Sequence, residues 1–394
     1  MKRLMIMFLL SFTTLLACTS AVISGKATPD GRPLLWKHRD TGSLENKLVY
    51  IAEKGYAFMG VSNVSDTQNR DIWMGMNESG FAIMNTASYN INESIPKELE
   101  EDSEGRFMRL ALETCASVND FEVLLQVSSG QWGLAANFGV IDADGNAAFF
   151  ETGYDQYVKY DVNDPETAPA GYLIRTNFSV AGKTDKGQGY IRYDATTALF
   201  EGRDAFTPEF ILKHGTRNLN HGVMKNHIGN MRLPKNREDR HLLAFQDYIT
   251  RYWSASVCVM QGVRPDEDPE NSVLWTVMGF PLTAMSVPVF FASREVLPKV
   301  ISAPPGELPF MAEAALKLKQ DLFPLENDDH ENYIDAAKLL NRKKDGYLQI
   351  VEKRETEIIG RFQEVKEKPD PASIQAYYEW LDTYVRDVYK ELLP

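Results

Sequence analysis

The sequence predicts a layered α+β protein of mainly antiparallel strands, with a helical extension at its C-terminal end. Three observations indicate this class. Short apolar runs rich in β-branched and aromatic residues, separated by tight turns, recur through the first half of the chain. Two consecutive helical patterns interrupt these runs, and paired helices between strand runs favour layered structure with antiparallel pairing. After residue 305 the chain becomes charged, poor in glycine and helical in its periodicity.

The first seventeen residues are typical of a signal peptide. Lys2 and Arg3 give a positive start, an apolar run follows over residues 4–16, and Ala17 precedes Cys18. The run is too short to span a bilayer, and no later stretch is long and apolar enough to do so. The sequence therefore predicts an exported protein, periplasmic or extracellular in a bacterium, whose mature chain begins at Cys18.

Strands and turns follow directly after Cys18. The turn Pro-Asp-Gly-Arg-Pro at residues 29–33 joins two apolar runs and predicts a hairpin at the mature N-terminus. Helices are expected over residues 104–115 and 118–127, the second capped by Ser117. Strands are expected over residues 19–24, from 34 to 36, and over 47–52, 57–61, 80–86, 137–141, 147–151, 157–160 and 172–176.

The chain is expected to divide after the signal peptide into a main domain, residues 18–305, and a helical extension, residues 306–394. Within the last segment, apolar residues from Ile374 to Leu392 recur at helical spacing and form one face. This face is expected to pack on the main domain or on a partner chain. A homo-oligomer formed through these helices is therefore one of the alternatives that the sequence allows.

Composition excludes several classes of protein. The formal net charge is -13 and there is no block of Lys and Arg, which argues against a nucleic-acid partner. The three cysteines, Cys18, Cys115 and Cys258, form no CxxC pair and no cluster with histidine, which argues against a disulfide scaffold and a zinc site. Cys115 and Cys258 lie in apolar patterns and are expected to be buried.

Cys18 has two competing interpretations. Residues 15–18, Leu-Leu-Ala-Cys, satisfy the lipobox of a lipoprotein, in which the cysteine is acylated and anchors a binding protein to a membrane. A lipoprotein normally continues with a flexible polar tether, whereas here strand-like sequence begins at once. A cysteine at the start of a strand is well placed to be held rigidly in a site, which favours a catalytic role.

The segment from Cys18 to Asp40 resembles the mature start of the cysteine N-terminal-nucleophile (Ntn) hydrolases. That superfamily includes choloylglycine hydrolase, penicillin V acylase, the acyl-CoA:6-aminopenicillanic acid acyltransferases (peptidase C45-like) and the N-terminal-cysteine dipeptidases. Its pattern is a first cysteine, an Asp-Gly turn, and a second strand ending in Arg-Asn-x-Asp or Gln-Asn-x-Asp. Lys-His-Arg-Asp at residues 37–40 fills that place, so Asp40 matches while Lys37 and His38 depart from the commoner residues.

Later segments agree with the same superfamily in order and type. Residues 75–82 resemble its GxNExG segment, and the strand that follows ends near Asn85. Residues 173–177 resemble the strand that presents an oxyanion asparagine, here Asn177. Arg192 falls where the superfamily has a site arginine. The resemblance implies a four-layer αββα sandwich, and it does not extend to the chain after residue 305.

The resemblance also implies a reaction, the cleavage of a linear amide in a small-molecule substrate without a metal or organic cofactor. An N-terminal cysteine supplies both the nucleophilic thiol and, through its α-amine with a reference pKa of about 7.7–8.0, the general base. Asp40 would accept a hydrogen bond from that amine and hold it in place. The alternatives are an acyltransferase that passes the acyl group to an amine, and a dipeptidase.

Four further residues complete the expected site. Lys37 would favour the thiolate and contact the substrate, and Arg192 would orient the site or bind a substrate carboxylate. Asn177, with a backbone N–H near Asn85, would stabilise the oxyanion of the tetrahedral intermediate. Each has a structural alternative: the asparagines can satisfy loop backbone, Arg192 can pair with Asp194, and Asp40 can cap a turn.

Overall fold

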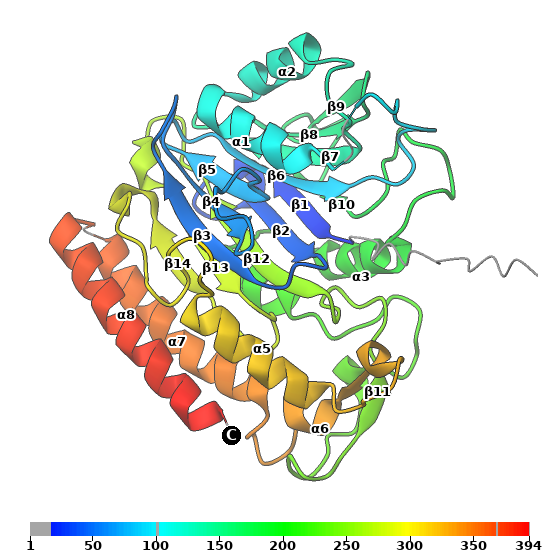
Figure 1. The fold of residues 1–394 in the computed structure, drawn as a ribbon, viewed down its shortest axis with the longest axis vertical. Coiled ribbons are helices and arrows are strands. Elements are labelled where there is room, and N and C mark those ends of the chain that lie inside the picture. Colours follow the sequence, from blue (N-terminus) through cyan, green and yellow to red (C-terminus); the bar gives the residue numbers. More distant parts are fainter. Residues whose placement is uncertain (1–16, 100–101, 368, 394) are drawn as a thin grey trace, which may run out of the picture.

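The computed structural model describes residues 17–99, 102–367 and 369–393, so the predicted signal peptide, apart from Ala17, lies outside the described residues. Its strands form two large sheets stacked on one another, with helices outside both (Figure 1). Every strand pairing within the two sheets is antiparallel.

Sheet A has the strand order β10-β1-β2-β12-β13-β14, and sheet B runs in sequence order from β3 to β9. The strands of sheet A are β1 (Thr19–Ile23), β2 (Leu34–Asp40), β10 (Tyr172–Arg175), β12 (Ser254–Gln261), β13 (Val273–Met278) and β14 (Val287–Phe290). The strands of sheet B are β3 (Asn46–Ile51), β4 (Phe58–Asn63), β5 (Met74–Asn77), β6 (Ala82–Ala87), β7 (Ala136–Ile141), β8 (Ala147–Thr152) and β9 (Tyr157–Asp161). A separate short pair joins β11 (Leu242–Ala244) to β15 (Tyr333–Asp335).

Helices cover the outer face of each sheet (Figure 1). On sheet B lie α1 (Glu104–Thr114) and α2 (Val118–Val127), whose apolar side chains form a core of their own with that sheet. On sheet A lie α3 (Tyr190–Phe200), α5 (Phe310–Leu322) and α7 (Tyr347–Lys366), with α8 (Pro371–Leu392) packed against α5 and α7. The remaining α-helices, α4 (Pro208–Phe210) and α6 (Ala336–Leu339), are short.

The hairpin of β1 and β2 lies in the interior of sheet A, between β10 and β12. Every residue of both strands is buried, because sheet B covers one face and helices cover the other. The stacked rings of Trp36 on β2 and Phe200 on α3 show the helical side of this packing. Gly31 in the connecting turn has a φ of 75°, a conformation that glycine adopts without steric cost. The hairpin therefore holds the residue before β1 beside the end of β2.

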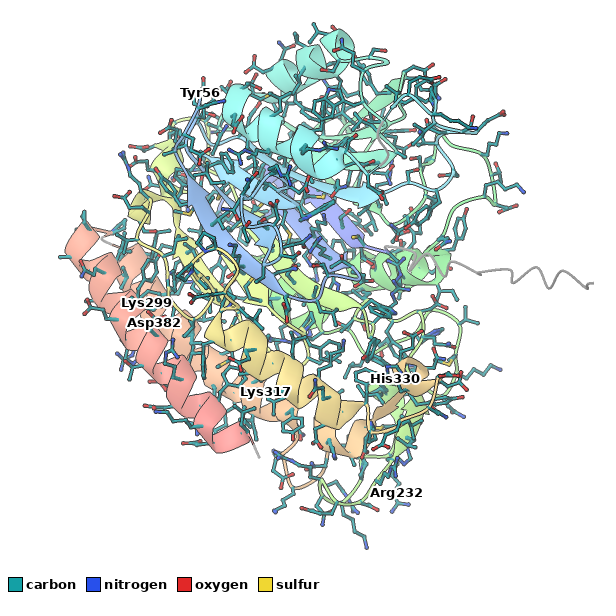
Figure 2. All side chains as sticks on the ribbon, viewed as in Figure 1. Tyr56, Arg232, Lys299, Lys317, His330 and Asp382 are labelled. Carbon is teal, nitrogen blue, oxygen red and sulfur yellow. The ribbon has the colours of Figure 1, made fainter. Side chains whose placement is uncertain are left out.

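The C-terminal helices share the hydrophobic core of sheet A. On α8, Ile374, Leu381 and Val385 are buried, as the periodicity of this segment predicts. A buried ion pair joins α7 to the core, since both Glu355 carboxylate oxygens accept hydrogen bonds from the Arg217 guanidinium at 2.6 and 2.9 Å. On α8 the Asp382 carboxylate accepts from the backbone N–H groups of residues 299 and 300, which lie just ahead of α5 (Figure 2).

The predicted fold class is confirmed: two mainly antiparallel sheets lie between layers of helices, and the C-terminal helices are present. Both predicted helices match α1 and α2 closely, and Ser117 caps α2 by accepting a hydrogen bond from the Asp120 N–H at 3.1 Å. The strands β12, β13 and β14 were not among the predicted ones. All their residues are buried, so apolar and polar residues do not alternate along them as they do in a half-buried strand. Among the described residues, no helix is long and apolar enough to cross a membrane.

Candidate active site

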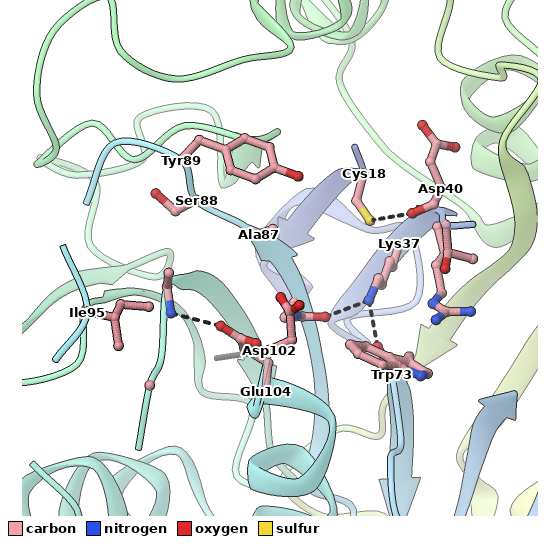
Figure 3. Close-up of a pocket in the computed structure, with 15 residues that line it drawn as sticks. Cys18, Lys37, Asp40, Trp73, Ala87, Ser88, Tyr89, Ile95, Asp102 and Glu104 are labelled. Carbon is pink, nitrogen blue, oxygen red and sulfur yellow. Dashed lines mark hydrogen bonds between the residues drawn. The ribbon is translucent and has the colours of Figure 1, made fainter. Parts of the chain in front are cut away.

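Cys18 lies directly ahead of β1 and lines a cavity of about 180 Å³ between the ends of the two sheets (Figure 3). The cavity wall comes from the end of β2, the end of β6, the residue ahead of β5 and the start of α1. Cys18 is only 6% exposed, and its Sγ lies 3.9 Å from the backbone carbonyl oxygen of Asp40. The antiparallel pairing of β1 with β2, in which Thr19 faces His38, keeps the thiol at this position.

Lys37 connects the two sheets beside Cys18. Its Nζ donates hydrogen bonds to Asn85 Oδ1 on β6, at 2.6 Å, and to the carbonyl oxygen of Trp73, at 2.7 Å (Figure 3). Burial lowers the pKa of Lys37 to about 7, with Arg39 acting in the same direction and Cys18 opposing it. The ammonium is therefore only partly populated at neutral pH, and it has an anionic partner whenever Cys18 is a thiolate.

Asp40 is held at the end of β2 by three side chains. Its carboxylate accepts hydrogen bonds from Arg251 Nε at 2.9 Å and Ser254 Oγ at 2.6 Å, and His38 Nδ1 lies 3.5 Å from it. Burial by itself raises the pKa of Asp40, but the Arg251 guanidinium and the nearby His38 ring outweigh it, so the net shift is downward. The carboxylate is thus kept ionised and points away from Lys37 (Figure 3).

Arg192 ties the backbone of Cys18 to Asn177. Its Nη1 donates to the carbonyl oxygen of Cys18 at 2.5 Å and to Thr19 Oγ1 at 2.9 Å, and its Nη2 donates to Asn177 Oδ1 at 2.8 Å. Gly189, at the start of α3, leaves room for this arrangement, because a Cβ there would lie 2.4 Å from Arg192 Nη2. Arg192 is 1% exposed and does not line the described cavity, so it orients Cys18 rather than facing the cavity.

Asn177 is fully buried behind Cys18. Its Nδ2 donates to the carbonyl oxygen of Ala87 at 3.0 Å, and the orientation of its amide is fixed by Arg192 at Oδ1. An amide nitrogen carries two hydrogens, so Nδ2 keeps a second donor beyond the bond to Ala87. The predicted residues thus form two groups in the described chain: Cys18, Lys37, Asp40 and Asn85 line the cavity, whereas Asn177 and Arg192 support Cys18 from within the fold.

Several cavity residues escaped the sequence analysis. Glu104 begins α1 and accepts a hydrogen bond from the Ala135 N–H at 2.8 Å, and burial raises its pKa to about 7. In the sequence it looks like an ordinary acidic residue in the first turn of a helix. Arg39 occupies the unspecified position of the motif, and Trp73 has no motif around it. Arg251, which binds the Asp40 carboxylate without lining the cavity, has no motif around it either.

The other two cysteines are structural. Cys115 and Cys258 are 1% and 0% exposed, as expected from their apolar surroundings, and all three cysteines are free thiols. Burial raises the pKa of both, that of Cys115 to about 11, which opposes formation of a reactive thiolate. Within the described part of the chain, no group of three or more His, Cys, Asp or Glu side chains is arranged to hold a metal ion.

Residues 30–198 match the model of the family described as acyl-coenzyme A:6-aminopenicillanic acid acyl-transferase. The match confirms the resemblance to this group of Ntn hydrolases that the order of the motifs predicts. It contains Asp40, Asn85, Asn177 and Arg192, and Cys18 lies ahead of it. A search among curated proteins found no similar sequence.

Three solved structures are similar to the chain at low sequence identity. The Caenorhabditis elegans ortholog of N-acylethanolamine-hydrolyzing acid amidase is 14% identical over 66% of this chain and 99% of its own, with a TM-score of 0.41. A mutant conjugated bile acid hydrolase from Clostridium perfringens is 13% identical over 69% and 92%, with a TM-score of 0.42. Penicillin V acylase from Agrobacterium tumefaciens is 11% identical over 70% and 86%, with a TM-score of 0.34.

Proposed function

We propose that the protein is an exported amidohydrolase that cleaves linear amides with Cys18 as its N-terminal nucleophile. The observation that carries the proposal is the position of Cys18, directly ahead of the interior strand β1 of sheet A and on the wall of a cavity it shares with the buried Lys37. Removal of residues 1–17 is part of the proposal, because only then does the nitrogen of Cys18 become an amine that can act as a base.

The reaction follows from the groups around the thiol. The α-amine takes the Cys18 proton, and the thiolate attacks the amide carbonyl to form a tetrahedral intermediate. The C–N bond then breaks, the proton passes from the α-ammonium to the departing amine, and a thioester remains on Cys18. A water molecule, deprotonated by the same amine, attacks the thioester, and the free acid leaves.

The surrounding residues would assist each step. The ionised Asp40 lies at the end of β2, close enough in the fold for its backbone to contact Cys18 Sγ, and it would hold the ammonium form of the α-amine. The cationic form of Lys37 would stabilise the thiolate. The second amide hydrogen of Asn177 and a backbone N–H near Asn85 would stabilise the oxyanion.

Mass spectrometry of the exported protein tests this proposal. The intact mass is expected to correspond to a chain that begins at Cys18 with a free amine. After brief mixing with N-acyl amino acids, penicillin V, conjugated bile salts or dipeptides, a productive substrate is expected to add its acyl mass to the peptide that contains Cys18. A mass increase from diacylglycerol at Cys18, or a first residue elsewhere, contradicts the mechanism and supports a lipid-anchored protein.

Lys37 gives the reaction a predictable pH dependence. Because the pKa of Lys37 is about 7, the wild-type protein loses this cation as the pH rises through that value, whereas arginine keeps its charge. The ratio of kcat/KM for Lys37→Arg to that for wild type is therefore expected to rise between pH 6 and pH 8. Lys37→Met, which has no cation at any pH, is expected to lose most activity at the acidic end.

Steady-state rates of all three proteins across this pH range check the expectation. A ratio that does not change with pH would show that the charge of Lys37 does not act on the reaction. A ratio that falls as the pH rises would assign the active form to the neutral amine of Lys37, which could then serve as a base. The exposed arginine variant Arg294→Gln is a control for general effects of changed charge.

A further inference from the structure

Arg39 is a second buried cation on the cavity wall, and the proposed reaction does not use it. It follows Lys37 by two residues on β2, so both side chains extend from the same face of the strand toward sheet B. Its Nη1 donates to Asn46 Oδ1 at 2.7 Å, and its guanidinium lies 4.7 Å from the centre of the Trp73 ring. Arg39 is 3% exposed and lines the same cavity as Cys18.

Unlike two other buried arginines, Arg39 makes no hydrogen bond to a carboxylate of the described residues, and it shares this property with Arg192, whose partners are also neutral. Arg175 pairs with Glu151 at 2.6 Å, and Arg217 pairs with Glu355 at 2.6 Å. Among the described residues, the hydrogen-bond partner of the Arg39 guanidinium is the neutral amide of Asn46. Burial lowers the pKa of Arg39 to about 10, as expected for a buried cation whose nearby charges do not offset its desolvation.

We propose that Arg39, stacked on Trp73, binds a carboxylate at the far end of the substrate's acyl group, so that amides of short dicarboxylic acids are preferred. This inference rests on the proposed function. A guanidinium stacked on an aromatic face keeps the N–H donors at its edge free for a carboxylate, which they can bind in a bidentate manner. The resulting ion pair would supply the anion that the buried Arg39 lacks.

The carboxylate is assigned to the acyl half because of how the reaction proceeds. The acyl group stays attached to Cys18 while the amine must leave before water attacks, so the acyl group suits the enclosed cavity. At about 180 Å³ the cavity is smaller than the roughly 300–1,000 Å³ typical of sites for drug-sized ligands, which limits it to a short chain.

Three acidic side chains line the same cavity, and they do not cancel this site at mildly acidic pH. The Asp40 carboxylate is already bound by Arg251 Nε and Ser254 Oγ, at 2.9 and 2.6 Å. Asp102 is exposed, so solvent screens its charge. The pKa of Glu104 is about 7, so at pH 6 most of this carboxyl group is protonated and can itself donate a hydrogen bond to a substrate carboxylate. We therefore place the test at pH 6, where Lys37 is also largely cationic.

The test compares N-glutaryl p-nitroanilide with its neutral isostere, the 4-carbamoylbutanoyl p-nitroanilide. Wild type is expected to prefer the glutaryl substrate, and Arg39→Gln is expected to lower kcat/KM for it by roughly ten- to hundred-fold, mainly through KM, with less than about a three-fold change for the isostere. Arg39→Lys is expected to retain part of the preference. The matched control Arg294→Gln removes an exposed arginine and should change neither substrate.

Several outcomes would overturn the inference. The first is a wild type that does not favour the glutaryl substrate over its isostere, a result that needs no variant and no assumption about folding. The second is an Arg39→Gln variant that turns over both substrates more slowly by the same factor and whose Cys18 also reacts more slowly with iodoacetamide, which would mean that Arg39 acts on the thiol. The third is a preference for a carboxylate only in the amine part of the substrate, measured as faster turnover of N-pentanoyl-glutamate than of N-pentanoyl-glutamine. It would place the bound anion on the amine side of the scissile bond and not on the acyl side.

Calorimetric binding to the Cys18→Ala variant separates this inference from the proposed function. If N-glutaryl p-nitroanilide binds in an Arg39-dependent way but wild type does not turn it over, the result would contradict the proposed amidohydrolase activity and support the anion subsite. If wild type turns over both substrates with no preference, the result would contradict the proposed anion subsite and support the proposed amidohydrolase activity. Absence of both binding preference and turnover would contradict both.

Discussion

Replacing Cys18 with serine is expected to lower kcat by roughly three orders of magnitude or more while leaving the fold intact. A serine hydroxyl has a much higher pKa than a thiol, and the α-amine of the first residue is too weak a base to activate it well. The side chain of residue 18 is small, and the contact its Sγ makes with the Asp40 carbonyl oxygen is long, at 3.9 Å, so serine should disturb the packing little.

Cys115→Ala is the matched control, since it removes a buried thiol from the core between sheet B and α1, apart from the cavity. Its turnover per folded molecule should equal that of wild type. Circular dichroism and thermal unfolding of each variant would report the folded fraction, and acyl-enzyme formation would be followed by intact mass. Normal turnover by Cys18→Ser would locate the nucleophile at another residue.

The local elements of this fold could be predicted because their signals are local. The helix α2 begins at its Ser117 cap, the bounds of α1 follow its apolar spacing to within one residue, and the β1–β2 hairpin follows from the turn around Gly31. The pairing of β2 with β12 could not be predicted in this way. It joins Asp40 to Ser254, which are 214 residues apart, and only tertiary packing places one beside the other.

The same limit explains which site residues the sequence could indicate. Lys37 and Asp40 lie in a short motif that resembles the Arg-Asn-x-Asp segment of the Ntn hydrolases, and this resemblance singled them out. Arg251, which holds the Asp40 carboxylate from 211 residues away, has no such signal. Glu104 and Trp73 reach the cavity because α1 and β5 pack beside the end of β2, and burial then raises the pKa of Glu104 to about 7. Neither the packing nor the shift is visible in composition.

Asn177 carries the prediction with the next largest effect. If its second amide hydrogen stabilises the oxyanion, Asn177→Ala is expected to lower kcat by about two orders of magnitude, with a smaller effect on KM, because the interaction forms mainly in the transition state. Arg192 fixes the amide by donating to Oδ1 at 2.8 Å, so the Nδ2 donor is already oriented before substrate binds. Such preorganisation is what makes an oxyanion donor effective.

Asn177→Asp separates the catalytic role from the structural one. The aspartate keeps an acceptor for Arg192 but replaces the Nδ2 donor with an oxygen that would repel both the oxyanion and the Ala87 carbonyl. Its kcat should therefore be at least as low as that of Asn177→Ala. Because Asn177 also bridges Ala87 and Arg192, both variants should unfold at a lower temperature, so kcat has to be expressed per folded molecule. A lowered melting temperature with normal turnover would make Asn177 a purely structural bridge between β6, α3 and the end of β10.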